Sequence, residues 1–142
     1  MFSQISADSN RSKYPSSEEC LKAIAFLADL GCAHVKETKK VSVFSTPNSR
    51  MFCVIWEADG VRRDRSIGEE RLALAFDPAL TESRILAAGI PALKISEGYC
   101  NSNMTCFPKV SHGDKTPIST ATKVTLSGIQ NIRRMITLYK GL

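Results

Sequence analysis

The sequence has 142 residues, of which 43% are hydrophobic and 23% are charged, and its net charge is +5. This length suits one domain, and the composition lies near the globular average, which excludes wholesale disorder, a coiled coil and a collagen-like fibre. No apolar run approaches the ~20 residues that cross a bilayer, and the N-terminus lacks the apolar stretch of a secretory signal, so we expect a cytoplasmic protein without a membrane partner.

The first element expected along the chain is a helix over about residues 17–30. Ser16 and Glu19 have the spacing of a capping box, in which each side chain accepts a hydrogen bond from a free backbone N–H. Apolar residues then recur at helical spacing up to Leu30. Gly31 suits the left-handed residue that ends a helix.

A β-hairpin is the clearest signal in the middle of the chain. The segment Met51–Ala58 is rich in aromatic and β-branched residues, and Asp59-Gly60 suits a two-residue turn. Val61–Ile67 is therefore the expected partner strand. The turn sets a register in which Val54 lies opposite Arg65.

Shorter strand signals flank this hairpin. β-Branched residues between Cys32 and Ser45 indicate one or two strands, and Ala92–Ser96 suits another. The run Arg71–Phe76 alternates in side-chain size, and periodicity in so short a run fits either a strand or a helix.

Two more helices and one long loop are expected in the second half of the chain. Asp77-Pro78 is typical of a helix start, which predicts a short helix over about residues 78–88. Residues 97–123 contain many Gly, Asn, Ser and Thr residues and predict a long irregular stretch, either a binding loop or a mobile segment. An apolar stripe then predicts a helix over about residues 125–140, with Thr125 or Ser127 as its cap.

Together these elements predict the α+β fold class. We expect a small, mainly antiparallel sheet around the 51–67 hairpin, flanked by the N-terminal, middle and C-terminal helices. Residues 1–15 are polar and are expected to form a mobile N-terminal segment, and residues 16–142 a single α+β domain.

The positive charge is concentrated in the last third of the chain. Asp114 is the only acidic residue between residues 101 and 142, where the basic residues are Lys109, Lys115, Lys123, Arg133, Arg134 and Lys140. An excess of this kind suits a surface that faces an acidic partner, although an ordinary solvated face has the same composition.

The candidate nucleic-acid-binding residues combine this excess with the hairpin. An indole beside two guanidinium groups is able to stack on a base while the cations hold phosphates. The alternative is that Trp56 belongs to the core, with the two arginines lying over it. The candidate residues are Trp56, Arg63, Arg65, Lys109, Lys115, Lys123, Arg133 and Arg134.

The chain carries no recognisable metal, cofactor or catalytic motif. Its five cysteines include no Cys-x2-Cys pair, and the spacing of Cys100, Cys106 and His112 is not a common zinc spacing. Phosphate-loop, dinucleotide and metalloprotease motifs are also missing. A thiol of Cys100 or Cys106 beside His112 is the one formal route to catalysis. Because no motif supports a catalytic, metal or cofactor site, we expect no enzyme activity, no metal and no cofactor.

The function expected from the sequence is that of a non-catalytic basic binding module with an acidic partner, nucleic acid being favoured over an acidic protein. The alternative is a protein-binding adaptor or inhibitor, of the kind encoded by mobile genetic elements, that uses a sheet edge and residues 97–123. Salt distinguishes the two hypotheses, because phosphate contacts release counterions whereas a protein interface responds far less.

Overall fold

The computed structural model of the protein describes residues 17–38, 40–56, 71–111, 113 and 116–142. The helices within these ranges are α1 (Ser17–Asp29), α3 (Glu82–Ala87) and α4 (Ile129–Lys140). The strands are β1 (Ala33–Glu37), β2 (Val41–Ser45), β3 (Met51–Ile55), β4 (Arg71–Phe76), β5 (Lys94–Cys100), β6 (Lys109–Val110) and β7 (Ile118–Ser127). None of these helices has both the length and the apolar character that crossing a membrane requires.

Helix α1 confirms the helix expected over residues 17–30. Gly31 adopts a φ of 85° immediately after it. The amide N–H of Gly31 donates to Ala28 O at 2.9 Å, and that of Cys32 donates to Leu27 O at 3.1 Å. This left-handed ending satisfies carbonyls that the last turn cannot pair, and it directs the chain into β1.

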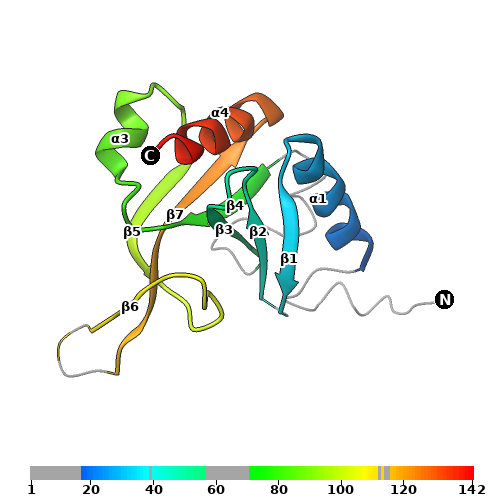
Figure 1. Ribbon diagram of the computed structural model, residues 1–142. Helices are drawn as coiled ribbons and strands as arrows, with labels where there is room; N and C mark the ends of the chain where they lie inside the picture. The colour runs from blue at the N-terminus through cyan, green and yellow to red at the C-terminus, as the bar shows by residue number, and fades with distance from the viewer. Residues whose placement is uncertain (1–16, 39, 57–70, 112, 114–115) are drawn as a thin grey trace.

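The described strands form a seven-stranded sheet in which each pair of neighbours is antiparallel (Figure 1). The strand order is β1-β2-β3-β4-β7-β5, and β6 pairs with β7 beside this path. The expected α+β class, with a mainly antiparallel sheet flanked by helices, is therefore confirmed.

Strand β3 lies where the hairpin predicts a strand, but its partners differ. Val54 pairs with Ser42 of β2 on one side and with Leu74 of β4 on the other. Because both edges are occupied, the register that set Val54 opposite Arg65 is wrong. The apolar sequence of β4 suits a strand that is buried on both faces, which an Arg-rich strand does not. The expected partner, Val61–Ile67, lies outside the described residues.

The prediction of an irregular stretch over residues 97–123 is wrong over much of its length. Strand β5 extends to Cys100, and β7 runs for ten residues from Ile118 between β4 and β5. Threonine is a favourable strand residue because its branched side chain packs well on a pleated surface. The Thr-rich residues at the end of this stretch therefore belong to a central strand.

The two later helices begin after their expected starts. Asp77 Oδ1 accepts a hydrogen bond from the Ala79 N–H at 2.8 Å, so Asp77-Pro78 forms a turn, and Thr81 caps α3 instead. Thr125 pairs with both Ala73 and Lys94 in the sheet, so it is not a helix cap. Gly128 occupies the N-cap position of α4 instead.

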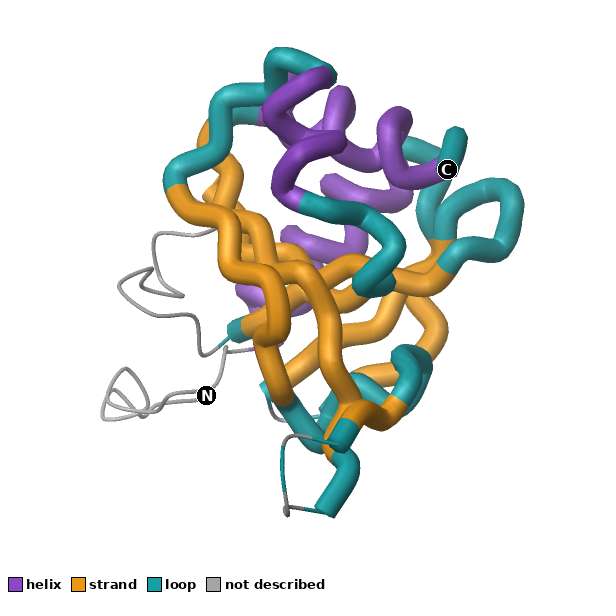
Figure 2. The backbone as a smooth tube through the Cα atoms, turned by 90° about the vertical axis from the view of Figure 1, so that its left-hand side faces the viewer, coloured by secondary structure: helices purple, strands orange, loops and turns teal. Residues whose placement is uncertain are grey.

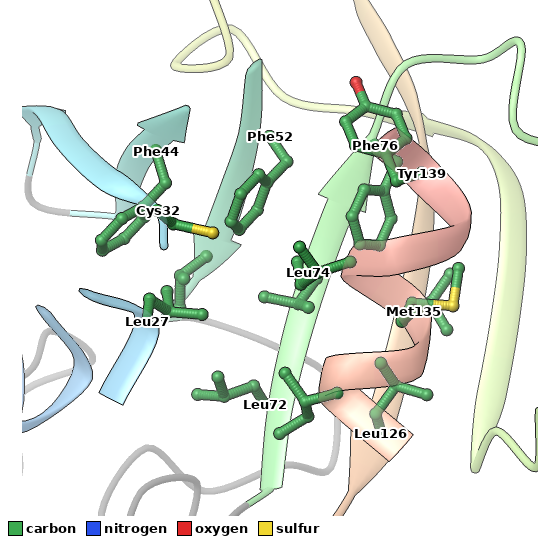
Figure 3. Packing of buried hydrophobic residues seen from close by; sticks show 14 of the residues in the cluster. Leu27, Cys32, Phe44, Phe52, Leu72, Leu74, Phe76, Leu126, Met135 and Tyr139 are labelled. Carbon is green, nitrogen blue, oxygen red and sulfur yellow. The ribbon is translucent and has the colours of Figure 1, made fainter. Parts of the chain in front are cut away.

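The helices pack on one face of the sheet (Figure 2). Tyr139 and Met135 of α4 lie against the strands, and the ring centroids of Tyr139 and Phe76 are 4.7 Å apart (Figure 3). Leu27 of α1 and Ile85 of α3 belong to the same buried cluster. This cluster is the main core of the protein, and it holds α4 against the sheet.

The opposite face of the sheet carries smaller side chains. Ala73, Ala75 and Ala121 lie there, each with at most 1% of its surface exposed. Met104 and Phe107, from the segment between β5 and β6, are buried in the same cluster. The small strand residues leave space that these two larger side chains occupy.

Candidate partner-binding face

The exposed side of helix α4 is the described surface that best meets the sequence expectation. Its buried side consists of Ile132, Met135, Ile136 and Tyr139. Its exposed residues are polar, and they are Gln130, Arg133, Arg134 and Thr137. This division follows the 3.6-residue period of the helix, which places its polar residues on one side. We call the side formed by Gln130, Arg133, Arg134, Thr137 and Lys140 the α4 face.

Hydrogen bonds to the sheet hold the C-terminal end of α4. The Tyr139 hydroxyl donates to Met51 O at 2.5 Å and accepts from the Asp77 N–H at 3.2 Å. Burial raises the pKa of this hydroxyl to about 12, so it keeps its proton at neutral pH. The α4 face is therefore carried by an element that is tied to two strand ends.

The turn between β2 and β3 fastens the same end of the helix. The Asn48 side chain donates to Lys140 O at 3.0 Å, and the Arg50 guanidinium donates to Leu142 O. These contacts join residues that are distant in the sequence, and they fix the position of Lys140 on the α4 face.

Arg134 connects α4 with the end of α3. Its guanidinium donates to Ala88 O and to Gly89 O, each at 3.2 Å. Carbonyls at a helix C-terminus carry partial negative charge, so a cation is favourable there. Part of the hydrogen-bonding capacity of Arg134 is thus taken up by contacts within the protein. No comparable contact holds Arg133 among the described residues.

Two adjoining hollows border the α4 face. One has a volume of about 320 Å³ and is lined by Ala88, Ile90, Arg133, Arg134, Thr137 and Leu138. The other has a volume of about 410 Å³ and is lined by Pro47, Asn48, Thr137, Lys140 and Gly141. Thr137 lines both hollows, so they meet at the middle of the exposed side of α4.

The charged side chains of the α4 face are all positive. The first turn of α4 contains no acidic residue, and Arg133, Arg134 and Lys140 make no ion pair with any carboxylate among the described residues. In the part of the chain that the structure describes, these cations therefore have no counter-charge in an ion pair that would compete with an anion. A surface of this kind attracts an acidic partner and orients it during approach.

Two of the residues expected to bind nucleic acid are buried. Trp56 is only 2% exposed, and its indole N–H donates to Ser42 Oγ at 2.8 Å on the helix-covered face of the sheet. Lys123 is 4% exposed on the opposite face, with its ammonium 4.7 Å from the centroid of the Tyr99 ring. In this conformation the indole cannot stack on a base, and the Lys123 ammonium cannot contact a phosphate.

The remaining expected residues do not all come together. Arg133 and Arg134 share the α4 face, whereas the exposed Lys109 belongs to β6 at the opposite end of the protein (Figure 1). Arg63, Arg65 and Lys115 lie outside the described residues. Among the described candidates, Arg133 and Arg134 are therefore the two that lie on one surface, beside Lys140.

Sequence reasoning missed three contributors to this surface. Lys140 and Thr137 share a helix face with Arg133. The spacing of the three residues in the sequence is sufficient to predict this shared face. Arg50 comes from the β2–β3 turn, and only the tertiary contact with Leu142 brings it to the end of α4.

The formal catalytic pairing of Cys100 or Cys106 with His112 lies outside the described residues, because His112 does. No group of three or more His, Cys, Asp or Glu side chains with the arrangement of a metal site occurs in the part of the chain that the structure describes. Comparison with the models of known protein families, with curated proteins and with solved structures found no match.

Proposed function

We propose that this protein is a non-catalytic binding module that engages an acidic partner through the α4 face, with nucleic acid as the favoured partner. One observation carries the proposal: Arg133, Arg134 and Lys140 lie along one side of a helix that is fastened to the sheet, without a described carboxylate beside them. Phosphate groups are the anions that such an array of fixed cations binds well.

The chemistry of the face favours contacts to the phosphate backbone over contacts to bases. Guanidinium groups bind phosphate oxygens through paired N–H donors, and the Lys140 ammonium acts as a point charge. With Trp56 enclosed in the core, no described aromatic residue of the α4 face offers a stacking surface. We therefore expect binding that depends little on base sequence.

The number of cations sets the expected response to salt. Three phosphate contacts predict a slope of about −2.7 in log affinity against log salt concentration, which is an affinity loss of about 40-fold between 50 and 200 mM salt. Binding would be of the weak, sequence-independent class, with dissociation constants of roughly 10⁻⁴–10⁻⁶ M.

Fluorescence anisotropy with labelled single- and double-stranded DNA and RNA of generic sequence, at both salt concentrations, tests this proposal. Arg133→Gln and Lys140→Gln are each expected to weaken binding and to reduce the salt slope by about 1. Lys109→Gln is the matched control, because it removes the same charge from an exposed site at the other end of the molecule. Absence of binding at 50 mM salt, or an equal loss in all three variants, would contradict the proposal.

The apolar lining of the hollow between α3 and α4 favours a second candidate, an adaptor that docks an acidic segment of another protein. Ala88, Ile90 and Leu138 form that lining, and Leu86 and Leu93 are 62% and 58% exposed. An acidic segment with an apolar anchor would complement both the hollow and the cations around it.

The substitution Thr137→Trp separates the two candidates, since Thr137 lines both hollows and is exposed. The larger side chain would fill the hollows while leaving Arg133 and Lys140 in place. We expect nucleic-acid affinity to change less than threefold. Loss of a partner captured from the native host, with weak dependence on salt, would instead support the adaptor.

A further inference from the structure

The second face of the sheet brings two thiols into contact. Cys53 lies in the middle of β3, paired with Val43 and Ala75, and its side chain is completely buried. Cys106 belongs to the segment between β5 and β6, and it is only partly buried. Their Sγ atoms are 3.7 Å apart.

The position of Cys106 follows from how its segment packs. Met104 and Phe107 on either side are buried against the sheet, and the Phe107 N–H donates to Met104 O at 3.2 Å in a tight turn. This turn sets Cys106 directly over Cys53. A disulfide needs sulfurs about 2.0 Å apart, so a small shift of the segment would bring the thiols to bonding distance.

We propose that Cys53 and Cys106 are a redox pair that a peroxide converts into an intramolecular disulfide. No other pair of described thiols has comparable geometry. Cys32 is buried on the helix-covered face, and the Cys100 sulfur contacts Gly98 O and Thr120 Oγ1.

The two thiols have different roles in this reaction. The hydrogen bond between the two sulfurs lowers the pKa of the more exposed Cys106, and the same hydrogen bond followed by burial raises the pKa of Cys53. Cys106 is therefore the thiolate that meets the oxidant, and Cys53 is the resolving thiol. Burial also raises the pKa of Cys32, to about 11, and that thiol has no second described thiol beside it.

The proposed reaction balances with hydrogen peroxide as the only oxidant. The Cys106 thiolate attacks one peroxide oxygen, the O–O bond breaks, and hydroxide leaves Cys106 as a sulfenic acid. The sulfur of Cys53 then attacks the sulfenic sulfur, and the hydroxyl group leaves as water with the Cys53 proton. The hydroxide takes up the proton that Cys106 lost, so two thiols and one peroxide give one disulfide and two waters.

The disulfide would fasten the covering segment to a central strand. It would join residues 53 positions apart in the sequence. Cross-links over long loops restrict the unfolded chain, so the midpoint of thermal unfolding should rise by several degrees in the oxidised protein. The pair lies on the sheet face opposite α4, so oxidation should leave the α4 face unchanged.

Mass spectrometry of the whole protein tests the proposal. After stoichiometric hydrogen peroxide and alkylation, we expect two of the five thiols to be lost, a mass decrease of about 2 Da before alkylation, and a peptide pair joined through Cys53 and Cys106. A reductant should reverse all three changes. Cys53→Ala should stop at oxidation of Cys106, and Cys106→Ser should keep Cys53 reduced.

Two cysteines outside the proposed pair provide control variants. Cys32→Ala and Cys100→Ser, a buried and an exposed thiol outside the pair, should leave the disulfide yield unchanged. The proposal is overturned if the cross-link involves Cys20 or Cys100 or joins two chains. It is also overturned if the wild-type protein and Cys53→Ala show the same oxidation products.

Discussion

Trp56 illustrates at the scale of one residue how a hydrogen bond keeps an aromatic ring in the interior. The indole N–H donates to Ser42 Oγ, and both groups are buried. Trp56 is also the only tryptophan in the sequence, so its fluorescence reports on this contact alone. We expect short-wavelength emission from the native protein, and no quenching when nucleic acid is added.

The substitution Ser42→Ala should lower the free energy of unfolding by about 1–3 kcal/mol, because it leaves a buried N–H donor without its partner. Urea unfolding followed by far-ultraviolet circular dichroism measures the change, because this signal does not depend on the tryptophan. The double variant Ser42→Ala with Trp56→Phe should lose less than the sum of the two single variants, since it removes donor and acceptor together. Strict additivity would show that the hydrogen bond contributes nothing to stability.

Side-chain orientation explains why some candidate residues from the sequence are exposed and others are buried. The sequence left Trp56 between a stacking role and a core role, and its hydrogen bond to Ser42 places it in the core. Lys123 carries a positive charge, but its register opposite Ala75 points it onto the covered face beside Tyr99. A charge count cannot identify which lysines a sheet encloses.

At the scale of elements, Gly128 joins the central strand β7 to α4. Its φ and ψ are 89° and 136°, a conformation that residues with a side chain rarely adopt, and an added Cβ would meet only Asn131 Nδ2 at 4.0 Å. Gly128→Ala should therefore lower the free energy of unfolding by about 1–3 kcal/mol through backbone strain.

Urea unfolding of Gly128→Ala beside Gly141→Ala measures this strain. Gly141 has a φ of −89°, and an added Cβ would make only ordinary contacts at 3.7 Å with Leu138 O and Thr137 O. The control should change stability by less than about 0.5 kcal/mol. Equal effects in the two variants would show that the conformation of Gly128 is not the cause.

Local signals explain which elements could be predicted. The expected helix over residues 17–30 matches α1 because its periodicity and its terminal glycine lie within the helix itself. The sequence predicts a loop for residues 118–123, which belong to β7, because this strand depends on its pairing with β4 and β5, which are distant in the sequence. The start of α4 was misplaced for the same reason, since the sheet uses Thr125 and Leu126.

At the scale of the whole molecule, Tyr139 ties the helix layer to the sheet, and this tie depends on pH. Burial raises its pKa from 10.0 to about 12. The unfolded chain therefore releases the tyrosine proton at lower pH than the folded protein does. The stabilisation is complete below pH 10 and is lost as the pH rises towards 12. A shift of this size corresponds to roughly 2–3 kcal/mol.

Tyr139→Phe isolates this contribution. We expect the variant to be less stable than the wild-type protein at pH 8, because Met51 O and the Asp77 N–H lose their partner. The difference should shrink at pH 11, as the wild-type protein loses the benefit of its protonated hydroxyl. Urea unfolding at both pH values measures it, and a constant difference would contradict the assigned cause.

The overall class was predictable, whereas the site was predictable only where it follows one helix. An α+β class follows from the mixture of helical and strand periods along the chain. Arg133, Thr137 and Lys140 could be grouped from helical spacing, but the hollows beside them need Pro47, Asn48 and the end of α3. Such junctions depend on the tertiary arrangement of the elements.

The placement of β7 affects how the protein assembles during synthesis. Until Ile118–Ser127 emerges from the ribosome, β4 has a bare edge and β5 has no described neighbour to pair with. The helix that closes the main core follows later still. Nascent chains would thus display an unsatisfied apolar sheet edge until β7 and α4 have both emerged, a period in which a chaperone would be most useful.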